Sequence, residues 1–341
     1  MRAAVYYSNK DIRVEEIPRP KVGPGELLVK VIASGICGSD VMEWYRIKKA
    51  PRVLGHEIAG DVVEIGSGVT RFKPGDRVFV THHVPCNDCR YCRAGQHTAC
   101  GTLQSTNFDP GGFAEYLRVP EINVRFGTFL LPESVSYDDG SFIEPLGCVI
   151  RGQRTAGVKE GDVVLVVGSG ISGLLHVKLA RAKKAGKIIA TDINDYRLNA
   201  ARKAGADLVI NAADDIPACV KEAAGGRGAD VVIVCTAADA AFQQAFASVD
   251  KGGTLLLFAP TAPEVRIPLP LFDLYFKLVR IVFSYAAVGD DLVSAIHLLQ
   301  TGQIAVDDLI THRLPLSETL TGFSLVATAD RSIKVLIYPN D

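Results

Sequence analysis

The chain has 341 residues, 48% of them hydrophobic, and a formal net charge of -1. One hydrophobic core usually organises no more than about 250–300 residues, so this length predicts two domains. The balanced charge excludes the basic footprint of a protein that binds nucleic acid or a membrane surface, and no apolar run reaches the length of about 18 residues typical of a transmembrane helix. A small neutral or mildly polar ligand is the partner that this composition favours.

Up to about residue 145, the apolar runs are short and rich in β-branched residues, as in Leu27–Val31 and Asp61–Ile65. Turn signals separate them at Gly23–Gly25, Gly66–Gly68 and Lys73–Asp76. Short strands bounded by such turns predict a small, barrel-like β domain.

Metal-capable side chains occur early in this β domain, with Cys37 in Gly-Ile-Cys-Gly-Ser-Asp and the pair His56-Glu57 in Leu-Gly-His-Glu. A thiolate, an imidazole and a carboxylate are zinc ligands. A buried cysteine and a hydrogen-bonded core histidine are equally common, so spacing alone leaves both interpretations open.

Four further cysteines, Cys86, Cys89, Cys92 and Cys100, form a C-x2-C-x2-C-x7-C run in a polar loop. Their spacing is typical of a closed, tetrahedral structural zinc site, which stiffens a loop and does no chemistry. Disulfides are disfavoured because the first three are too close together to pair readily, and reducing conditions suit zinc thiolates. Since the N-terminus also lacks the pattern of a signal peptide, we expect a cytoplasmic protein.

From about residue 150 the pattern changes to alternating strands and alanine-rich helices. Buried strands are expected over Val163–Val167, Lys187–Thr191, Asp230–Val234 and Thr254–Phe258. This alternation predicts a parallel, doubly wound sheet, and thus an α/β protein overall. Beyond about residue 285 we expect a helix over Asp291–Thr301 and strands near His312–Leu314 and Lys334–Tyr338.

A glycine fingerprint, G-x-G-x-x-G, follows the first of these strands and begins a helix, as in dinucleotide-binding folds. Asp192, at the end of the next strand, can accept hydrogen bonds from the adenosine ribose and would repel a 2′-phosphate, so NAD is preferred over NADP. Arg197 could stack on adenine or tolerate NADP. The expected cofactor-binding residues are Gly168, Gly170, Ile171, Gly173, Asp192 and Arg197.

The motifs of both halves resemble those of the zinc-containing medium-chain alcohol dehydrogenases and occur in that family's order. Two further segments share this resemblance, Gly111–Tyr116 and Glu144-Pro145-Leu146. The chain is most similar to the polyol branch typified by sorbitol (L-iditol) 2-dehydrogenase. This resemblance implies a GroES-like catalytic domain with two zinc sites over residues 1–148 and a Rossmann NAD-binding domain over 149–285. It also implies that residues 286–341 return to the catalytic domain.

The resemblance further implies that Cys37 and His56 bind a catalytic zinc, while Glu57 and Glu144 compete for its remaining positions. Such a zinc lowers the pKa of an alcohol, whose hydride then passes to NAD. Ser39 would pass the released proton onward. Many relatives carry a histidine three residues after this hydroxyl, where this chain has Met42, so the last proton acceptor is left open between water and His82 or His83.

We therefore expect a zinc-dependent, NAD-linked dehydrogenase that converts a polyol or another secondary alcohol to a ketone. Trp44, Tyr45 and Phe108 are expected to border the site, or else to pack in the core. A threonine- or butanediol-type dehydrogenase of the same family is the nearest alternative, and a non-catalytic NAD-binding relative is a more distant one. By family habit the protein is expected to be a homotetramer or homodimer.

Overall fold

The computed structural model describes the whole chain, residues 1–341. It divides into two compact units, one formed by Met1–Gly147 together with Ala286–Asp341, and the other by Cys148–Tyr285. None of the helices combines the length and the apolar character needed to cross a membrane.

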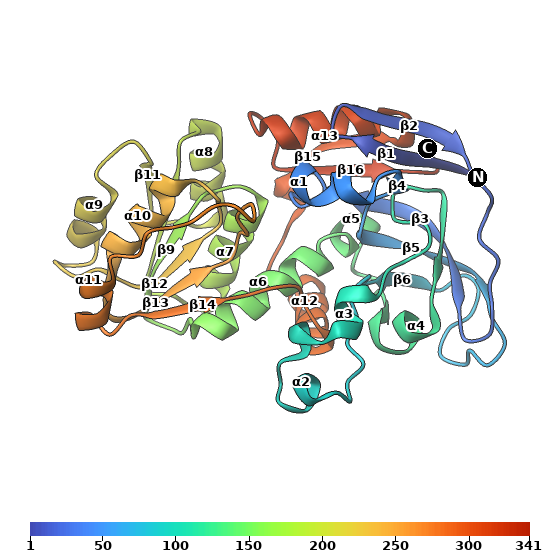
Figure 1. Ribbon diagram of the computed structural model, residues 1–341, viewed down its shortest axis with the longest axis horizontal. Helices are drawn as coiled ribbons and strands as arrows, with labels where there is room; N and C mark the ends of the chain where they lie inside the picture. Colours follow the sequence, from blue (N-terminus) through green and yellow to red (C-terminus); the bar gives the residue numbers. More distant parts are fainter. The chain divides into compact units, whose positions relative to one another are not determined.

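The first unit is built on β-strands (Figure 1). They are β1 (Arg2–Ser8), β2 (Asp11–Glu16), β3 (Leu27–Gly35), β4 (Arg52–Val53), β5 (Glu57–Ile65), β6 (Arg77–Val80), β7 (Tyr116–Val119), β8 (Thr128–Leu130), β15 (Ile310–Pro315) and β16 (Lys334–Tyr338). The larger sheet has the order β15-β16-β3-β5-β6-β8, with β7 also paired to β3, and the smaller sheet has the order β2-β1-β4. Alternate residues of β3, such as Leu27, Val29 and Val31, pack into one hydrophobic core, as expected for a period of two.

Short helices connect these strands. They are α1 (Glu43–Arg46), α2 (Arg90–Arg93), α3 (Gly101–Ser105), α4 (Glu121–Gly127), α5 (Tyr137–Gly140), α12 (Gly289–Gln300) and α13 (Thr319–Thr328), with 3-10 turns η1 (Ile47–Lys49), η2 (His97–Ala99), η3 (Asp307–Leu309) and η4 (Leu316–Glu318). Helix α6 (Ile143–Ala156) begins in the first unit and ends in the second.

The last strand, β16, lies inside the larger sheet rather than at its edge. It runs parallel to β15 and antiparallel to β3, with Leu336 opposite Gly35. The two ends of the chain lie close together (Figure 1), and the Arg2 guanidinium donates to the Pro339 carbonyl at 3.3 Å. The C-terminal segment is therefore an internal part of the first unit.

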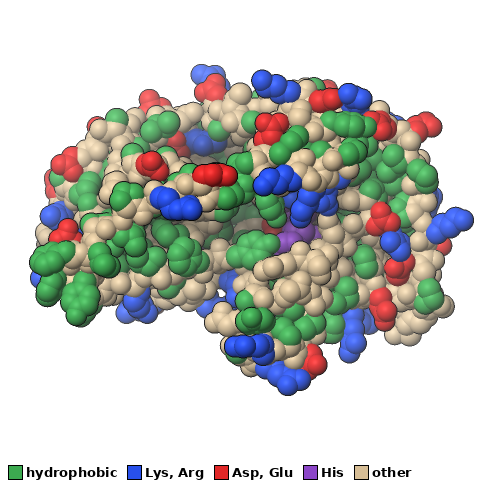
Figure 2. Space-filling model, viewed as in Figure 1, with side chains coloured by type: hydrophobic (Ala, Val, Ile, Leu, Met, Phe, Trp, Pro, Cys, Tyr) green, Lys and Arg blue, Asp and Glu red, His purple; other side chains and the backbone are tan.

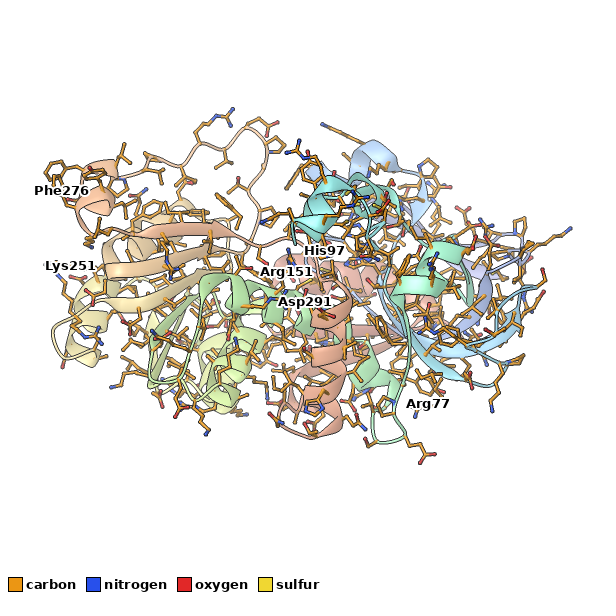
Figure 3. All side chains as sticks on the ribbon, turned by 90° about the horizontal axis from the view of Figure 1, so that it is seen from below. Arg77, His97, Arg151, Lys251, Phe276 and Asp291 are labelled. Carbon is orange, nitrogen blue, oxygen red and sulfur yellow. The ribbon has the colours of Figure 1, made fainter.

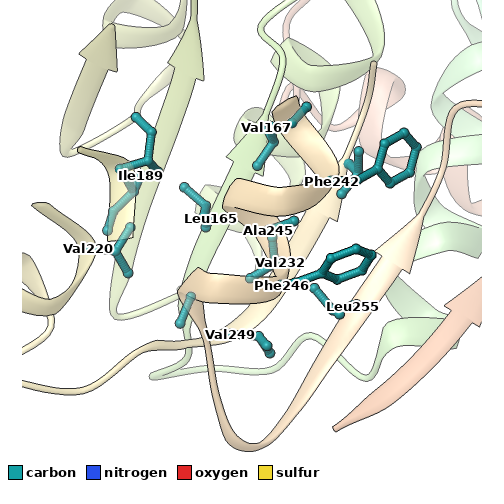
Figure 4. Packing of buried hydrophobic residues seen from close by; sticks show 14 of the residues in the cluster. Leu165, Val167, Ile189, Val220, Val232, Phe242, Ala245, Phe246, Val249 and Leu255 are labelled. Atoms are coloured by element: carbon teal, nitrogen blue, oxygen red, sulfur yellow. The ribbon is translucent and has the colours of Figure 1, made fainter. Parts of the chain in front are cut away.

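The second unit is a parallel sheet flanked by helices. Its strands are β9 (Val163–Val167), β10 (Lys187–Asp192), β11 (Leu208–Asn211), β12 (Ala229–Val234), β13 (Val249–Leu257) and β14 (Arg280–Phe283), and its helices are α7 (Ile171–Ala182), α8 (Asp195–Ala204), α9 (Ile216–Ala223), α10 (Asp239–Ser248) and α11 (Leu271–Phe276). The order β11-β10-β9-β12-β13-β14 is that of a Rossmann fold. Figure 4 shows the core of this unit, a hydrophobic cluster in which Phe242 and Phe246 of α10 join Leu165, Val232 and Leu255 of the sheet.

The expected strands and tail helix are all present, with small shifts at their ends. The largest shift is in β13, which begins at Val249 rather than at Thr254. Its pairing with β12 is irregular between Ala229 and Val231, and Gly252, at φ +71°, allows the chain to continue through that irregularity. The predicted α/β fold class is confirmed.

Candidate active site

The glycine turn between β9 and α7 gives each of its glycines a different structural role. Gly168 has φ +94°, a left-handed conformation that glycine adopts without strain. A Cβ at Gly173 would collide with the Gly168 carbonyl, so this glycine packs the helix closely on the strand. The nearest atom to a Cβ at Gly170 is Nη1 of Arg197, 3.8 Å away. Gly170 is thus the open position where a pyrophosphate can approach the amides at the start of α7.

Asp192 holds this turn in shape. Its carboxylate accepts hydrogen bonds from the backbone N–H of Ser169 at 2.8 Å and from that of Asn194 at 2.9 Å. Each carboxylate oxygen can accept a further bond, so the side chain can hold the turn and still receive ribose hydroxyls. Arg197, beside Gly170, has no protein partner for its buried Nε. The charge of Arg197 therefore remains available to the nucleotide.

The four loop cysteines converge as a closed group. Their sulfur atoms all lie within 4.8 Å of one another, with Cys89 and Cys92 3.6 Å apart and Cys86 and Cys100 also 3.6 Å apart. Zn–S bonds of about 2.3 Å place the sulfurs of a tetrahedral site about 3.8 Å apart. All four thiols are free, and these separations fit a shared zinc ion far better than disulfides.

Backbone amides favour the thiolate form at two of these cysteines, whereas burial raises the pKa of Cys92 to about 12. Hydrogen bonds from the N–H groups of Asp88 and Cys89 lower the pKa of Cys86. Burial raises the pKa of Cys100, but bonds from the N–H groups of Cys86 and Leu103 outweigh it and bring the pKa to about 6. Because zinc binds the thiolate, this environment suits the metal.

Cys37, His56 and Glu57 form a second group, whose ligand atoms also lie within 4.8 Å of one another. The sheet brings them together, since Gly35 at the end of β3 is paired with Glu57 at the start of β5. Cys37 follows β3 and His56 precedes β5. One sulfur, one nitrogen and one oxygen donor make the three-ligand set of a catalytic zinc, which keeps a further position open.

Asp40 orients this second group. Its buried carboxylate accepts from the Cys37 N–H at 3.1 Å and lies 3.4 Å from Nδ1 of His56. Burial lowers the pKa of His56, but Asp40 and Cys37 outweigh it and raise that pKa well above its usual value. With Nδ1 directed at Asp40, the other ring nitrogen of His56 is left to face a ligand, as in many zinc sites.

Of the two candidate glutamates, Glu57 belongs to this compact group, and Glu144 is buried in the first turn of α6. Glu57 is also paired with a partner that the sequence did not indicate, the ammonium group of Lys334 on β16. A Cβ at Gly35 would lie 2.6 Å from Nζ of Lys334. The first glycine of the Cys37 motif therefore makes room for a buried ion pair.

Ser39 also has an unexpected partner. Its hydroxyl lies 3.4 Å from the Cys37 sulfur and accepts from Nη2 of Arg46 at 2.9 Å. The same Nη2 donates to Asp40 at 3.1 Å, and Nε donates to the Ser39 carbonyl at 3.0 Å. No motif marked Arg46, and only its place seven residues after the relay serine could have suggested this contact.

The remaining candidates lie around this group. The His82 ring is 4.6 Å from that of His56 and 3.7 Å from that of His83. Burial is the main cause that lowers the pKa of His82 well below its usual value and that of His83 to about 4. Phe108 is buried 6.2 Å from His82, whereas Trp44 and Tyr45 are each 38% exposed. Met42 precedes α1 and cannot carry a proton.

The Rossmann sheet with its glycine turn, the closed cysteine group and the open Cys-His-Glu group together define a zinc-dependent, nicotinamide-nucleotide-linked dehydrogenase. The family model "Alcohol dehydrogenase GroES-like domain" matches residues 23–126, and "Zinc-binding dehydrogenase" matches residues 172–301. The chain belongs to this zinc-containing medium-chain alcohol dehydrogenase family, in its sorbitol dehydrogenase-like branch.

Individual relatives match along the whole length. Sorbitol dehydrogenase of Bacillus subtilis (strain 168) is 33% identical, over 100% of this chain and 98% of that protein. A zinc-binding dehydrogenase from Sinorhizobium meliloti 1021, bound to NADP, has 30% identity, a TM-score of 0.89 and 99% coverage of both chains. The 2R,3R-butanediol dehydrogenase from Bacillus subtilis has 29% identity and a TM-score of 0.87, again with 99% coverage of both. The chain is thus an alcohol or polyol dehydrogenase that uses zinc and NAD.

Proposed function

We propose that this enzyme oxidises a secondary alcohol of a polyol-like substrate with Cys37, His56 and Glu57 holding the catalytic zinc. The observation that carries the proposal is the convergence of these three ligand atoms within 4.8 Å. Bound there, zinc would act as a Lewis acid on the alcohol oxygen. Glu57 is proposed as the direct protein ligand in preference to Glu144, because the Glu57 carboxylate belongs to the compact group.

Ser39 is proposed as the first proton acceptor. Because Arg46 donates to one lone pair of the serine oxygen, the other lone pair is left to accept the proton of the substrate hydroxyl, and the serine's own proton leaves in turn. The guanidinium stabilises negative charge on the serine oxygen while the proton is passed on. Arg46 stays protonated, so it cannot replace the histidine that Met42 displaces, and water is proposed to take the proton onward.

The four loop cysteines are proposed to hold the structural zinc, which brings the total to two zinc ions per chain. Both metal groups lie in the unit that contains Met1–Gly147, and we propose that this unit, completed by the C-terminal segment, is the catalytic domain. Cys148–Tyr285 is proposed as the NAD domain, with the pyrophosphate at Gly168, Gly170, Ile171 and Gly173 and the ribose at Asp192.

A second copy of the chain is the proposed protein partner. Strand β14 forms an edge of the Rossmann sheet, and neighbouring apolar side chains are exposed, with Phe272 75%, Phe276 66% and Phe283 73% accessible. Figure 2 shows hydrophobic side chains gathered around α11, and in Figure 3 Phe276 projects outward from that helix. An open edge beside an apolar surface suits pairing with a second copy. Light scattering at the monomer mass would refute this association.

We propose that the enzyme acts in the cytoplasm, where reducing conditions keep all eight cysteines available as thiols or zinc ligands. This part of the proposal is supported by the free thiols. Localisation of a tagged chain tests it, and recovery from an oxidising compartment would contradict it.

The catalytic proposal is tested by following NADH absorbance with polyols, secondary alcohols, 2,3-butanediol and threonine, before and after metal removal. We expect turnover that depends on metal and is highest with polyols or other secondary alcohols. Preference for threonine or butanediol would favour that alternative branch. In parallel, Cys37→Ser should lower the zinc content by one ion per chain; an unchanged content would refute the assignment of the catalytic ligands.

A further inference from the structure

The segment between Ser39 and His56 carries four cationic residues, and the proposed reaction uses only Arg46 among them. Arg46 ends α1, Lys49 ends the η1 turn and Arg52 begins β4. Figure 2 shows Lys and Arg side chains directly beside the histidine surface on this face of the molecule. The net charge of the whole chain gave no indication of this, because the cations are concentrated at one site.

Arg46 lies deepest. Its side chain is only 14% exposed. It donates to the Ser39 hydroxyl, which in turn contacts the Cys37 sulfur. Two of its nitrogens, Nε and Nη2, are engaged by Ser39 and Asp40. Nη1 has no acceptor in the protein, so one side of the planar fork is left for a ligand.

Arg52 is half-buried, its backbone is paired with β1, and its guanidinium takes part in no hydrogen bond or ion pair with the protein. Burial first, and then the charge of Arg46, lower the pKa of Arg52, so the two guanidinium groups act on each other. Lys49 extends the same cluster: its Nζ lies 5.9 Å from the centroid of the Tyr45 ring, over which Arg46 also lies at 4.6 Å. Arg46 and Arg52 are both partly buried, and cations partly out of water are unfavourable without an anion.

The protein supplies too little negative charge here. Asp40 is the only acidic side chain that pairs with any of the three cations, and it is already shared with His56 and the Cys37 N–H. Glu43, nearby in sequence, instead accepts from the Asn9 N–H at 3.1 Å. The cluster of Arg46, Lys49 and Arg52 thus retains a positive excess beside the metal-binding group.

We propose that this cluster binds an anionic group of the substrate, so that the enzyme acts on a polyol chain carrying a carboxylate or a phosphate. The proposal rests on the proposed function, since it takes Cys37, His56 and Glu57 as the place where the alcohol reacts. The fork of a guanidinium matches the paired oxygens of either anion. With the reacting hydroxyl at Ser39 and the anion at Arg52, the substrate has a defined direction in the site.

The test compares a neutral polyol with the matching sugar acid and polyol phosphate, for example sorbitol, gluconate and sorbitol 6-phosphate, at saturating NAD with zinc-loaded enzyme. We expect kcat/KM to favour at least one anionic substrate. In Arg52→Gln, the ratio of anionic to neutral kcat/KM should fall about 10- to 150-fold, as for a lost hydrogen bond to a charged group. Lys49→Gln, a surface change that spares the fold, should lower it less. Lys48→Gln, the exposed neighbour, should leave the ratio unchanged.

Calorimetry adds a readout that needs no turnover. Gluconate and sorbitol 6-phosphate are titrated into enzyme saturated with zinc and NADH, and the weaker binding of the preferred anion to Arg52→Gln should match the kinetic change. NADH affinity is measured for every variant. The two anions distinguish a carboxylate site from a phosphate site.

Several results would overturn the proposal. If neutral polyols are turned over and the ratio of anionic to neutral kcat/KM is the same in wild type and Arg52→Gln, the anion site is rejected. The dehydrogenase assignment would stay intact. Weaker NADH binding in Arg52→Gln, with that ratio unchanged, would mean that the cations bind the cofactor's phosphates instead. Anion binding that depends on Arg52, without turnover of any polyol, would support the anion site and count against the proposed function.

Discussion

Replacing Lys334 by methionine tests the buried ion pair beside the candidate catalytic metal group. The side chains of Lys334 and Glu57 are 1% and 2% exposed, and Nζ of Lys334 lies 5.6 Å from the centroid of the Phe142 ring. Methionine has a similar volume and no charge, so the variant leaves the Glu57 carboxylate buried without a cation.

Removing one partner of a buried ion pair costs about 3–5 kcal/mol. In a unit of roughly 200 residues, each kcal/mol lowers Tm by about 2–4 °C. We therefore expect the first unit of metal-free Lys334→Met to unfold about 6–20 °C below the metal-free wild type. Zinc bound by Glu57 would supply the missing positive charge, so the loss should be smaller in the zinc-loaded protein.

Scanning calorimetry of metal-free and zinc-reconstituted forms provides the measurement. Lys30→Met on β3, where the lysine is only half-buried, is the matched control, and the double variant Lys334→Met/Glu57→Gln should recover much of the stability because no unpaired charge remains. A metal-free loss no larger than that of the control would refute the energetic reasoning. An equal loss with and without zinc would show that Glu57 does not bind the metal.

Four further outcomes are expected. Cys89→Ser should remove one zinc ion per chain and lower Tm while NADH affinity is retained; metal analysis that still finds two ions would contradict the closed site. Asp192→Ala should lower the ratio of kcat/KM with NAD to kcat/KM with NADP about 10-fold or more, because a bond to the ribose and a repulsion of the 2′-phosphate are both lost. An unchanged ratio would show that Asp192 only holds the turn. Ser39→Ala should lower kcat about 100-fold or more with little change in NADH affinity, whereas equal effects would mark Ser39 as structural. Burial lowers the pKa of His176 to about 3, below the value of about 6.5 in the unfolded chain. The contribution of His176 to stability is therefore complete above about pH 6.5, and about 1.4 kcal/mol of it is lost for each pH unit below that value. Tm profiles of wild type and His176→Leu that run parallel between pH 6.5 and 4.5 would refute this.

The sequence predicted the fold class because its strongest signals are local. A buried strand, a glycine fingerprint and a helix lie within twenty residues of each other, and Gly168, Gly170 and Gly173 meet steric requirements of that one turn. The cysteine loop is equally local. Signals of this kind can be interpreted without knowing how distant segments pack.

The missed features depend on contacts that only the folded chain creates. Glu57 meets Lys334 across 277 residues of sequence, and no periodicity indicates that pairing, although a lysine at the start of an apolar strand is unusual. Arg46 is close in sequence to Ser39, but its direction depends on the short helix α1 and on Asp40. The sequence also could not indicate that Glu57 lies close to Cys37, because the pairing of β3 with β5 brings them together.

The position of β16 between β15 and β3 has a consequence for the order of events during synthesis. Residues 148–285 are contiguous and can fold as soon as they leave the ribosome, whereas the first unit waits for the last eight residues of the chain, Lys334–Asp341, to complete its sheet and to neutralise Glu57. Domains that close over such long sequence separations fold slowly. A chain that stopped before Lys334 would therefore carry a finished Rossmann unit and an incomplete reaction centre, so such a stop would abolish turnover before it abolished nucleotide binding.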